Sequence, residues 1–150
     1  MFEKIEEGGK KIFRGWSPFA FPIVIRTNYE TSKFKVMKEF ALIFRLKDIA
    51  DFKPSPEQMQ ERMNWLAGIA AQNKLADKGN TLLPAPGSAK VVKPGNVVTD
   101  GPYTEIKEFV SGYVVIRAES IEEAVEVARA NPIFDQVGGN IEVREVLRRD

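Results

Sequence analysis

The sequence contains no cysteine and no histidine, and these absences exclude several kinds of active site. Without cysteine the chain has no disulfides, no thiolate zinc sites and no cysteine nucleophile. Without histidine, no imidazole can act as a general base, complete a Ser-His-Asp triad or bind a metal. Any acid–base chemistry must therefore use carboxylates, lysine or tyrosine with shifted pKa values. We predict no metal site and no cofactor.

An excess of either charge is also absent, because 22 lysine and arginine residues nearly cancel 21 aspartate and glutamate residues, for a net charge of +1. Phosphate backbones are usually bound by a clustered basic excess, so this balance argues against direct nucleic-acid binding. The apolar stretch at residues 13–25 is interrupted by glycine and proline and is too short to span a membrane. Glu3, Glu6 and Glu7 are atypical of a signal peptide. These observations predict a cytoplasmic protein with no membrane partner.

The length and the hydrophobic content of the chain are typical of one globular domain. With 150 residues, 43% of them hydrophobic, the chain can bury about two-thirds of its unfolded surface. We place this domain at residues 37–150 and expect residues 37–147 to fold alone. Residues 1–36 are interpreted as an N-terminal extension, and three alternatives stay open for it: a disordered segment, a lineage addition, or the product of an upstream start codon. Residues 21–25 are also a candidate edge strand.

Two segments, residues 38–46 and 109–117, have apolar residues on both faces of a predicted strand and therefore need cover on both sides. Between them, Ser55, Pro56 and Gln58 predict a helix start, in which Ser55 caps the helix and Gln58 completes a capping box. Apolar residues at three- and four-residue spacing then predict a core-facing stripe on this helix. The stripe consists of Met59, Met63, Leu66, Ile69 and Ala70.

The remaining segments complete an alternating pattern. The pair Lys78-Gly79 predicts a break of the first helix, and a second capped helix begins at Ser120. Further strands are predicted at residues 81–85, 89–93, 96–99 and 140–147, with the second and third of these forming a hairpin. The order β-α-β(β)-β-α-β is that of a ferredoxin-like split βαβ sheet, so the predicted fold class is α+β. Because two helices cover only one face of such a sheet, the doubly apolar strands predict a two-fold, sheet-against-sheet homodimer.

The most informative segment is TDGPYTEIKE at residues 99–108, which continues into Gly112 and an apolar run. This segment resembles the signature of the DGPF branch of the YCII-related family, in which TDGPF precedes E-x-K-E, a glycine and an apolar strand. Tyr103 replaces the usual phenylalanine and adds a hydroxyl that can form hydrogen bonds.

The resemblance extends to both ends of the domain. MKEF at residues 37–40 resembles the start of the family domain, while Asn131-Pro132 and IEVR at residues 141–144 resemble its end. Glu145 departs from the proline that commonly follows the arginine in the family. The resemblance implies a dimeric α/β barrel.

Asp100 is the candidate catalytic residue, because the turn that follows it concentrates functional groups. The alternative is structural, since an aspartate at a turn routinely accepts backbone N–H hydrogen bonds. Tyr103, Lys107 and Glu108 are candidate substrate-binding residues that could surround a small polar or anionic ligand. For Lys107 and Glu108 the alternative is a solvated strand edge.

Arg144 is the remaining candidate substrate-binding residue. It lies two positions from Glu142 on the last predicted strand, so both side chains belong to one face. If that face borders a cleft between two sheets, Arg144 provides a cation for a carboxylate or phosphate, or keeps Asp100 or Glu142 ionised. A structural ion pair is the alternative.

The predicted function is that of a small-molecule-binding homodimer with a polar cleft at the TDGPY turn, with a lyase or isomerase step by carboxylate chemistry as a further hypothesis. Other YCII branches are described with a His-Asp pair as the active site, which this chain cannot have, so whether it is an enzyme stays open. The alternative, which the resemblance suggests, is a non-catalytic regulatory or interaction module that acts with a protein partner such as an extracytoplasmic-function sigma factor.

Overall fold

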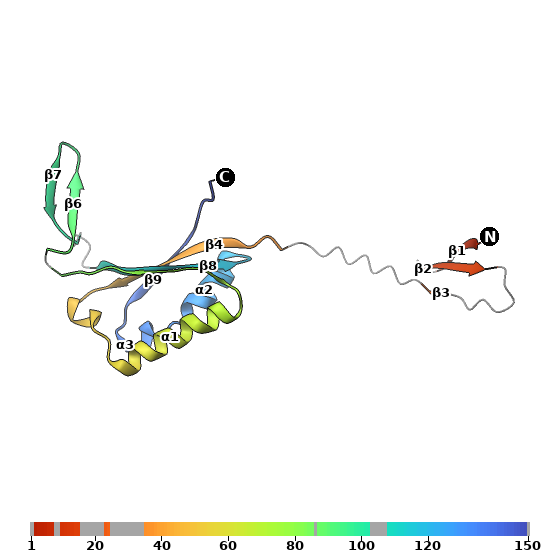
Figure 1. Cartoon of the computed structure of the whole chain (residues 1–150), viewed down its shortest axis with the longest axis horizontal. Helices are drawn as coiled ribbons and strands as arrows, with labels where there is room; N and C mark the ends of the chain where they lie inside the picture. The colour runs from red at the N-terminus through yellow and green to blue at the C-terminus, as the bar shows by residue number, and fades with distance from the viewer. Residues whose placement is uncertain are drawn as a thin grey trace. The chain divides into compact units, whose positions relative to one another are not determined.

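The computed structural model describes residues 2–7, 10–15, 23–24, 35–85, 87–102 and 108–149. The chain divides into two compact units, Met1–Lys35 and Val36–Asp150. In the first unit, three antiparallel strands form a sheet in the order β1-β2-β3 (Figure 1). They span Phe2–Glu7 (β1), Lys10–Gly15 (β2) and Ile23–Val24 (β3). The candidate edge strand at residues 21–25 thus contains β3, which pairs with β2 inside this small sheet.

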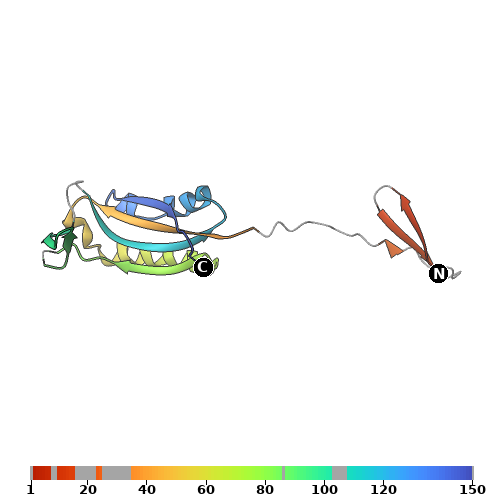
Figure 2. The same cartoon turned by 90° about the horizontal axis from the view of Figure 1, so that it is seen from above.

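The second unit is built on a four-stranded antiparallel sheet. Its strands span Lys38–Leu46 (β4), Leu75–Thr81 (β5), Phe109–Ala118 (β8) and Asn140–Glu145 (β9). They lie in the order β5-β8-β4-β9. The helical elements are Ile49–Phe52 (η1), Pro56–Ala71 (α1), Ile121–Arg129 (α2) and Ile133–Gln136 (α3). Both α1 and α2 lie on the same face of the sheet (Figures 1 and 2). The predicted α+β, ferredoxin-like fold is confirmed.

The starts of both long helices follow from their capping residues. At α1, Ser55 Oγ accepts from the Gln58 N–H at 3.3 Å and Gln58 Oε1 accepts from the Ser55 N–H at 2.9 Å, which is the predicted capping box. At α2, Ser120 Oγ accepts from the Glu123 N–H at 3.2 Å. The reciprocal bond differs there, because the Glu123 carboxylate accepts from the N–H of Glu119 at 2.7 Å.

The predicted helix break at Lys78-Gly79 is wrong, because α1 already ends at Ala71 and β5 runs through this pair. Gly79 has a φ of +64°, and the register of β5 against β8 shifts between Asp77 and Asn80. A Cβ at Gly79 would lie only 1.6 Å from the carbonyl oxygen of Tyr113. The glycine therefore allows β5 to follow an irregular course very close to β8. In the sequence, the same glycine suggested the end of a helix.

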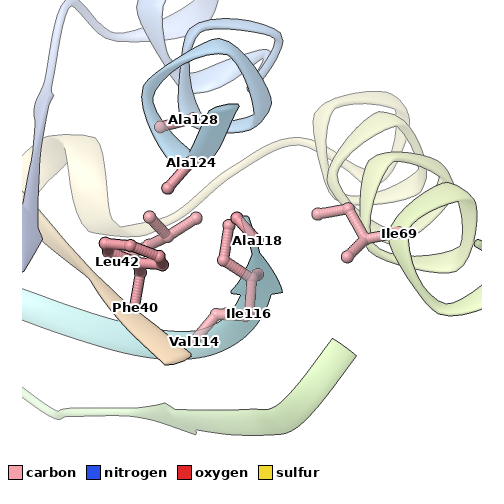
Figure 3. Packing of buried hydrophobic residues seen from close by; sticks show 8 residues of the cluster. All are labelled: Phe40, Leu42, Ile69, Val114, Ile116, Ala118, Ala124 and Ala128. Atoms are coloured by element: carbon pink, nitrogen blue, oxygen red, sulfur yellow. The ribbon is translucent and has the colours of Figure 1, made fainter. Parts of the chain in front are cut away.

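The main core lies between the sheet and α2. It consists of Phe40, Leu42, Ile69, Val114, Ile116, Ala118, Ala124 and Ala128 (Figure 3). Cross-strand pairing places Phe40 opposite Ile116 and Leu42 opposite Val114 on the face that the helices cover. Figure 3 shows the two alanines of α2 directed toward these side chains, with Ile69 reaching in from α1.

The predicted core-facing stripe of α1 is only partly correct. Ile69 is buried and Leu66 packs against the core, but Met59 is 46% exposed and Met63 is 59% exposed. Ala70 is exposed as well. The periodicity correctly indicates an amphipathic helix, but it does not determine how closely the helix approaches the sheet.

The opposite face of the sheet carries those side chains of β4 and β8 that point away from the helices. Ala41 pairs with Val115 and Ile43 pairs with Tyr113, and all four are partly exposed. Within the described part of the second unit, no helix covers this face (Figure 1). The sheet-against-sheet homodimer stays a prediction.

A hairpin of β6 (Lys90–Lys93) and β7 (Val97–Asp100) forms a separate two-stranded sheet, as the sequence predicted. It projects from one end of the main sheet on the side opposite the helices (Figure 1). Val92 is 74% exposed and Val98 is 59% exposed, so the hairpin displays apolar side chains to solvent.

Candidate functional site

A cavity of about 370 Å³ lies between α1 and the sheet. We name it the α1 cavity; it is lined by residues of α1, η1, the end of β4, β5 and β8. Most of its wall is apolar. The large apolar side chains that line it include Phe44, Phe52, Met59, Met63, Trp65 and Leu66.

Trp65 connects α1 to both of its neighbours beside this cavity. Its ring meets that of Phe44 edge to face, with centroids 6.3 Å apart and planes at 81°. Its indole Nε1 donates to the carbonyl oxygen of Val127 in α2 at 3.2 Å. These contacts fix the middle of α1, and Ile69 anchors its second half in the core. The first half of the helix thus borders the cavity through Met59 and Met63.

Arg62 brings a charge to this largely apolar lining. Its Nε donates to Gln136 Oε1 at 2.9 Å, and Gln136 is itself oriented by donating from Nε2 to Glu61 Oε2 at 2.7 Å. In contrast, Nη2 of Arg62 is buried and has no hydrogen-bond partner among the described residues. Burial lowers the pKa of Arg62 below its usual value, because the cation loses solvation. A guanidinium nevertheless stays charged at neutral pH.

Several other polar groups of the lining have structural partners. Ser111 Oγ donates to the carbonyl oxygen of Phe44 at 3.3 Å, and Asn80 Nδ2 donates to the Tyr113 hydroxyl at 3.1 Å. Asn131 is buried and its Oδ1 accepts from the N–H of Ile133 at 2.8 Å. Among the buried side-chain nitrogen and oxygen atoms that the structure describes, Nη2 of Arg62 thus stands out because it has no hydrogen-bond partner.

Asp100, the predicted catalytic residue, ends β7 and pairs with Lys90 directly across the hairpin. Its carboxylate accepts from Lys90 Nζ. The backbone N–H groups of residues 103–107 lie outside the described residues, so the alternative role of Asp100 as an acceptor in the turn stays a prediction. The Asp100 side chain is 88% exposed, and ion pairs in such solvated positions contribute little to stability. Asp100 does not line the α1 cavity.

A second cavity, of about 580 Å³, lies at the base of the hairpin. Lys90, Pro102 and Glu108 line this hairpin cavity, which adjoins the TDGPY turn. Glu108 accepts from Asn140 Nδ2 at 2.9 Å. The structure therefore places Glu108 and the partner of Asp100 beside one cavity.

Tyr103 and Lys107, two of the predicted substrate-binding residues, lie outside the residues that the structure describes. Their roles in a cleft at the TDGPY turn stay predictions.

Arg144 lies on β9 opposite Ala41, on the sheet face away from the helices. Its Nε is 3.7 Å from Glu142 Oε1, and its side chain is 68% exposed. Glu142 also accepts from Arg45 Nη2 at 2.5 Å. Arg144 thus has the ion-pair partner that its spacing suggested, and it lines neither the α1 cavity nor the hairpin cavity.

A model of the YCII-related domain matches residues 45–149. The chain belongs to the YCII-related family. The match covers both long helices, the hairpin and the lining of the α1 cavity apart from Phe44. The family resemblance is confirmed at this level, whereas assignment to the DGPF branch stays a prediction. A search of curated proteins finds no match to this chain.

Two further searches of the described residues concern metals and membranes. No group of three or more acidic side chains is placed to hold a metal ion in that part of the chain. Likewise, none of the helices described has both the length and the hydropathy to cross a membrane.

The sequence interpretation missed Arg62, although the sequence does contain a signal for it. Arg62 is three residues after Met59 and four before Leu66, so it interrupts the apolar stripe on its own face of α1. A single arginine in an amphipathic helix is usually solvated, and its burial depends on the separation between helix and sheet.

Proposed function

We propose that this YCII-related protein binds a small organic molecule in the α1 cavity. The observation that carries the proposal is the cavity itself, whose volume of about 370 Å³ and mainly apolar lining are combined with a few polar groups. Small-molecule sites commonly have this composition and occupy clefts of about 300–1,000 Å³. The sequence also predicted small-molecule binding, but in a cleft at the TDGPY turn. The proposed site is therefore at a different place in the fold.

We favour binding over catalysis as the primary role. A carboxylate that removes a proton from carbon needs burial to become sufficiently basic, and the Asp100 side chain is 88% exposed. No carboxylate belongs to the described lining of the α1 cavity. The lyase or isomerase step is therefore a hypothesis for the hairpin cavity, where Glu108 lies beside Lys90.

We also propose that the protein forms a homodimer through the sheet face that α1 and α2 leave open. The partly exposed Ala41, Ile43, Tyr113 and Val115 support this interface, because a second copy would cover them. Light scattering at micromolar concentration tests the proposal. A folded monomer at that concentration would contradict it.

The alternative function is an interaction module, and the exposed apolar residues of the hairpin favour it. Val92 is 74%, Val97 49% and Val98 59% exposed. A protein partner, such as the sigma factor that the family resemblance suggests, would cover this surface. Replacing Val92 and Val98 by threonine should abolish binding of such a partner but leave ligand binding in the α1 cavity unchanged.

A thermal-shift screen of small organic molecules tests the ligand proposal. A ligand at a hundred times its dissociation constant should stabilise the fold by about 2.7 kcal/mol. Leu66→Trp, which fills the α1 cavity, should remove this response. Ile121→Trp is the matched control, because Ile121 is 45% exposed on α2 and lines neither cavity. A response that survives Leu66→Trp would place the ligand elsewhere.

A further inference from the structure

The charged lining of the α1 cavity has a single sign. Arg62 and Lys78 line it, whereas aspartate and glutamate are missing from its described lining. Elsewhere in the unit, several arginines and lysines are paired with carboxylates, as Arg45 is with Glu142 and Lys38 with Glu145. The α1 cavity therefore has a cationic potential that no lining side chain neutralises.

Arg62 is the better of these two cations for binding an anion, because its guanidinium has a nitrogen without a hydrogen-bond partner among the described residues. Gln136 holds the Nε side of the group at 2.9 Å, while the buried Nη2 has no partner among the described residues. A buried donor without a partner costs free energy, and the cost is larger for a charged group. A ligand that accepts from Arg62 would remove that cost on binding.

We infer that the ligand of the α1 cavity is an amphipathic anion, with a carboxylate or sulfonate bound by Arg62 and an apolar or aromatic body against Met63 and Trp65. The inference rests on the proposed function of this cavity and specifies its ligand class. A planar guanidinium binds a carboxylate through two parallel hydrogen bonds, which gives the head group a fixed orientation.

A modest movement of Arg62 is part of this binding mode. Protein atoms cover Nη2, so its terminal torsions must turn to present the nitrogen to an anion in the cavity. This rotation moves Nη2 from a buried position without a hydrogen-bond partner among the described residues to a position in which it donates to the ligand. Met59 and Met63 border the same space and are flexible side chains that can adjust to this turn.

Two fluorescent probes with the same ring system test the inference: 8-anilinonaphthalene-1-sulfonate, which is anionic, and N-phenyl-1-naphthylamine, which is neutral. The chain has two tryptophans, so in a full-length Trp16→Phe background Trp65 is the single donor for energy transfer to a probe in the cavity. Arg62→Met should weaken binding of the sulfonate about tenfold or more, and change binding of the neutral probe by less than about twofold.

Three further variants make the result specific. Arg129→Met removes one positive charge from α2, outside the α1 cavity, and should leave both affinities unchanged. Arg62→Lys retains the charge without the planar fork, so it should weaken sulfonate binding less than Arg62→Met, and it also tests the site if Arg62→Met fails to fold. Leu66→Trp adds a second tryptophan, so it is read by exciting the probes directly, and the emission of both probes should fall to its level without protein.

The outcomes separate the two proposals. Equal sulfonate binding by the parent and by Arg62→Met would overturn the anionic ligand class while leaving the cavity as a ligand site. Absence of energy transfer to either probe in the parent, or enhanced probe emission that survives Leu66→Trp under direct excitation, would overturn the proposed function and the inference together. Equal weakening of both probes by Arg62→Met would assign Arg62 a structural role and also reject the anion.

Discussion

The two long helices cover the same face of one sheet, yet they pack against it differently. α2 meets the sheet through Ala124 and Ala128, which are 0% and 4% exposed. Small residues at a contact allow a helix to come close to its neighbour. α1 has only Ile69 fully buried among its residues, and the flexible side chains of its first half border a cavity instead. The comparison indicates that space for a ligand arises beneath the less tightly packed of the two long helices.

The largest predicted effect comes from the irregular strand beneath α1. Gly79→Ala should destabilise the protein by more than about 4 kcal/mol, since the added Cβ would collide with backbone at a residue with positive φ. Gly138→Ala is the matched control, because its φ is +63° and nothing lies within 4 Å of a Cβ there. That control should cost only about 1–2 kcal/mol. Urea denaturation measures both, and similar losses would show that β5 adapts easily to the added methyl group.

A pair of enlarging substitutions tests the packing difference directly. Ala128→Leu should cost about 1–3 kcal/mol, because α2 has no space for the added atoms. Leu66→Trp on α1 adds more volume but should cost less than about 1 kcal/mol, since the cavity accommodates it. Chemical denaturation of the two variants gives the comparison. A larger loss for Leu66→Trp would mean that the α1 cavity closes in solution.

The hydrogen bond between the helices has a smaller expected effect. Trp65→Phe keeps an aromatic ring near Phe44 but removes the donor to the Val127 carbonyl, so it should cost about 0.5–1.5 kcal/mol. Val127→Ala retains the backbone acceptor and serves as a control for packing at the same contact. If Trp65→Phe is fully neutral in thermal unfolding, the bond does not fix α1 relative to α2.

The smallest predicted effect concerns a carboxylate at the start of β4. A hydrogen bond from Arg148, with its charge, holds the pKa of Glu39 below its usual value of 4.5. A depressed folded-state pKa adds stability that is present above the unfolded pKa and lost as the pH falls through the folded one. Glu39→Gln should therefore be less stable than the parent at pH 7 by at most about 1 kcal/mol, and this difference should be smaller at pH 3. Urea unfolding at both pH values measures it, and a constant difference would contradict the linkage.

The sequence predicted those parts of the fold that depend on local pattern. The strand at residues 38–46 coincides with β4, and the strand at 109–117 ends one residue before β8 does. A short run with apolar residues on both faces is typical of a core strand, so its extent can be read from neighbouring residues alone. The cap at Ser55 was equally predictable, because it requires only neighbouring residues.

The α1 cavity could not be predicted in this way. The spacing of Met59 and Met63 indicated a core-facing stripe, but their distance from the sheet depends on Trp65, which contacts Phe44 and the distant Val127. The burial of Arg62 follows from the same arrangement. Likewise, Gly79 is compatible with either a break or a bulge, and only the pairing of β5 with β8 decides between them.

The irregular course of β5 also bears on how the protein resists aggregation. β5 and β9 are the outer strands of the main sheet, and an outer strand with a regular row of free N–H and C=O groups can recruit a strand from another molecule. The register shifts around Gly79 interrupt that row on β5. On β9, the charged and exposed Arg144 and Glu145 oppose close approach of a second strand. Both margins of the sheet are therefore poor templates for uncontrolled growth of fibrils.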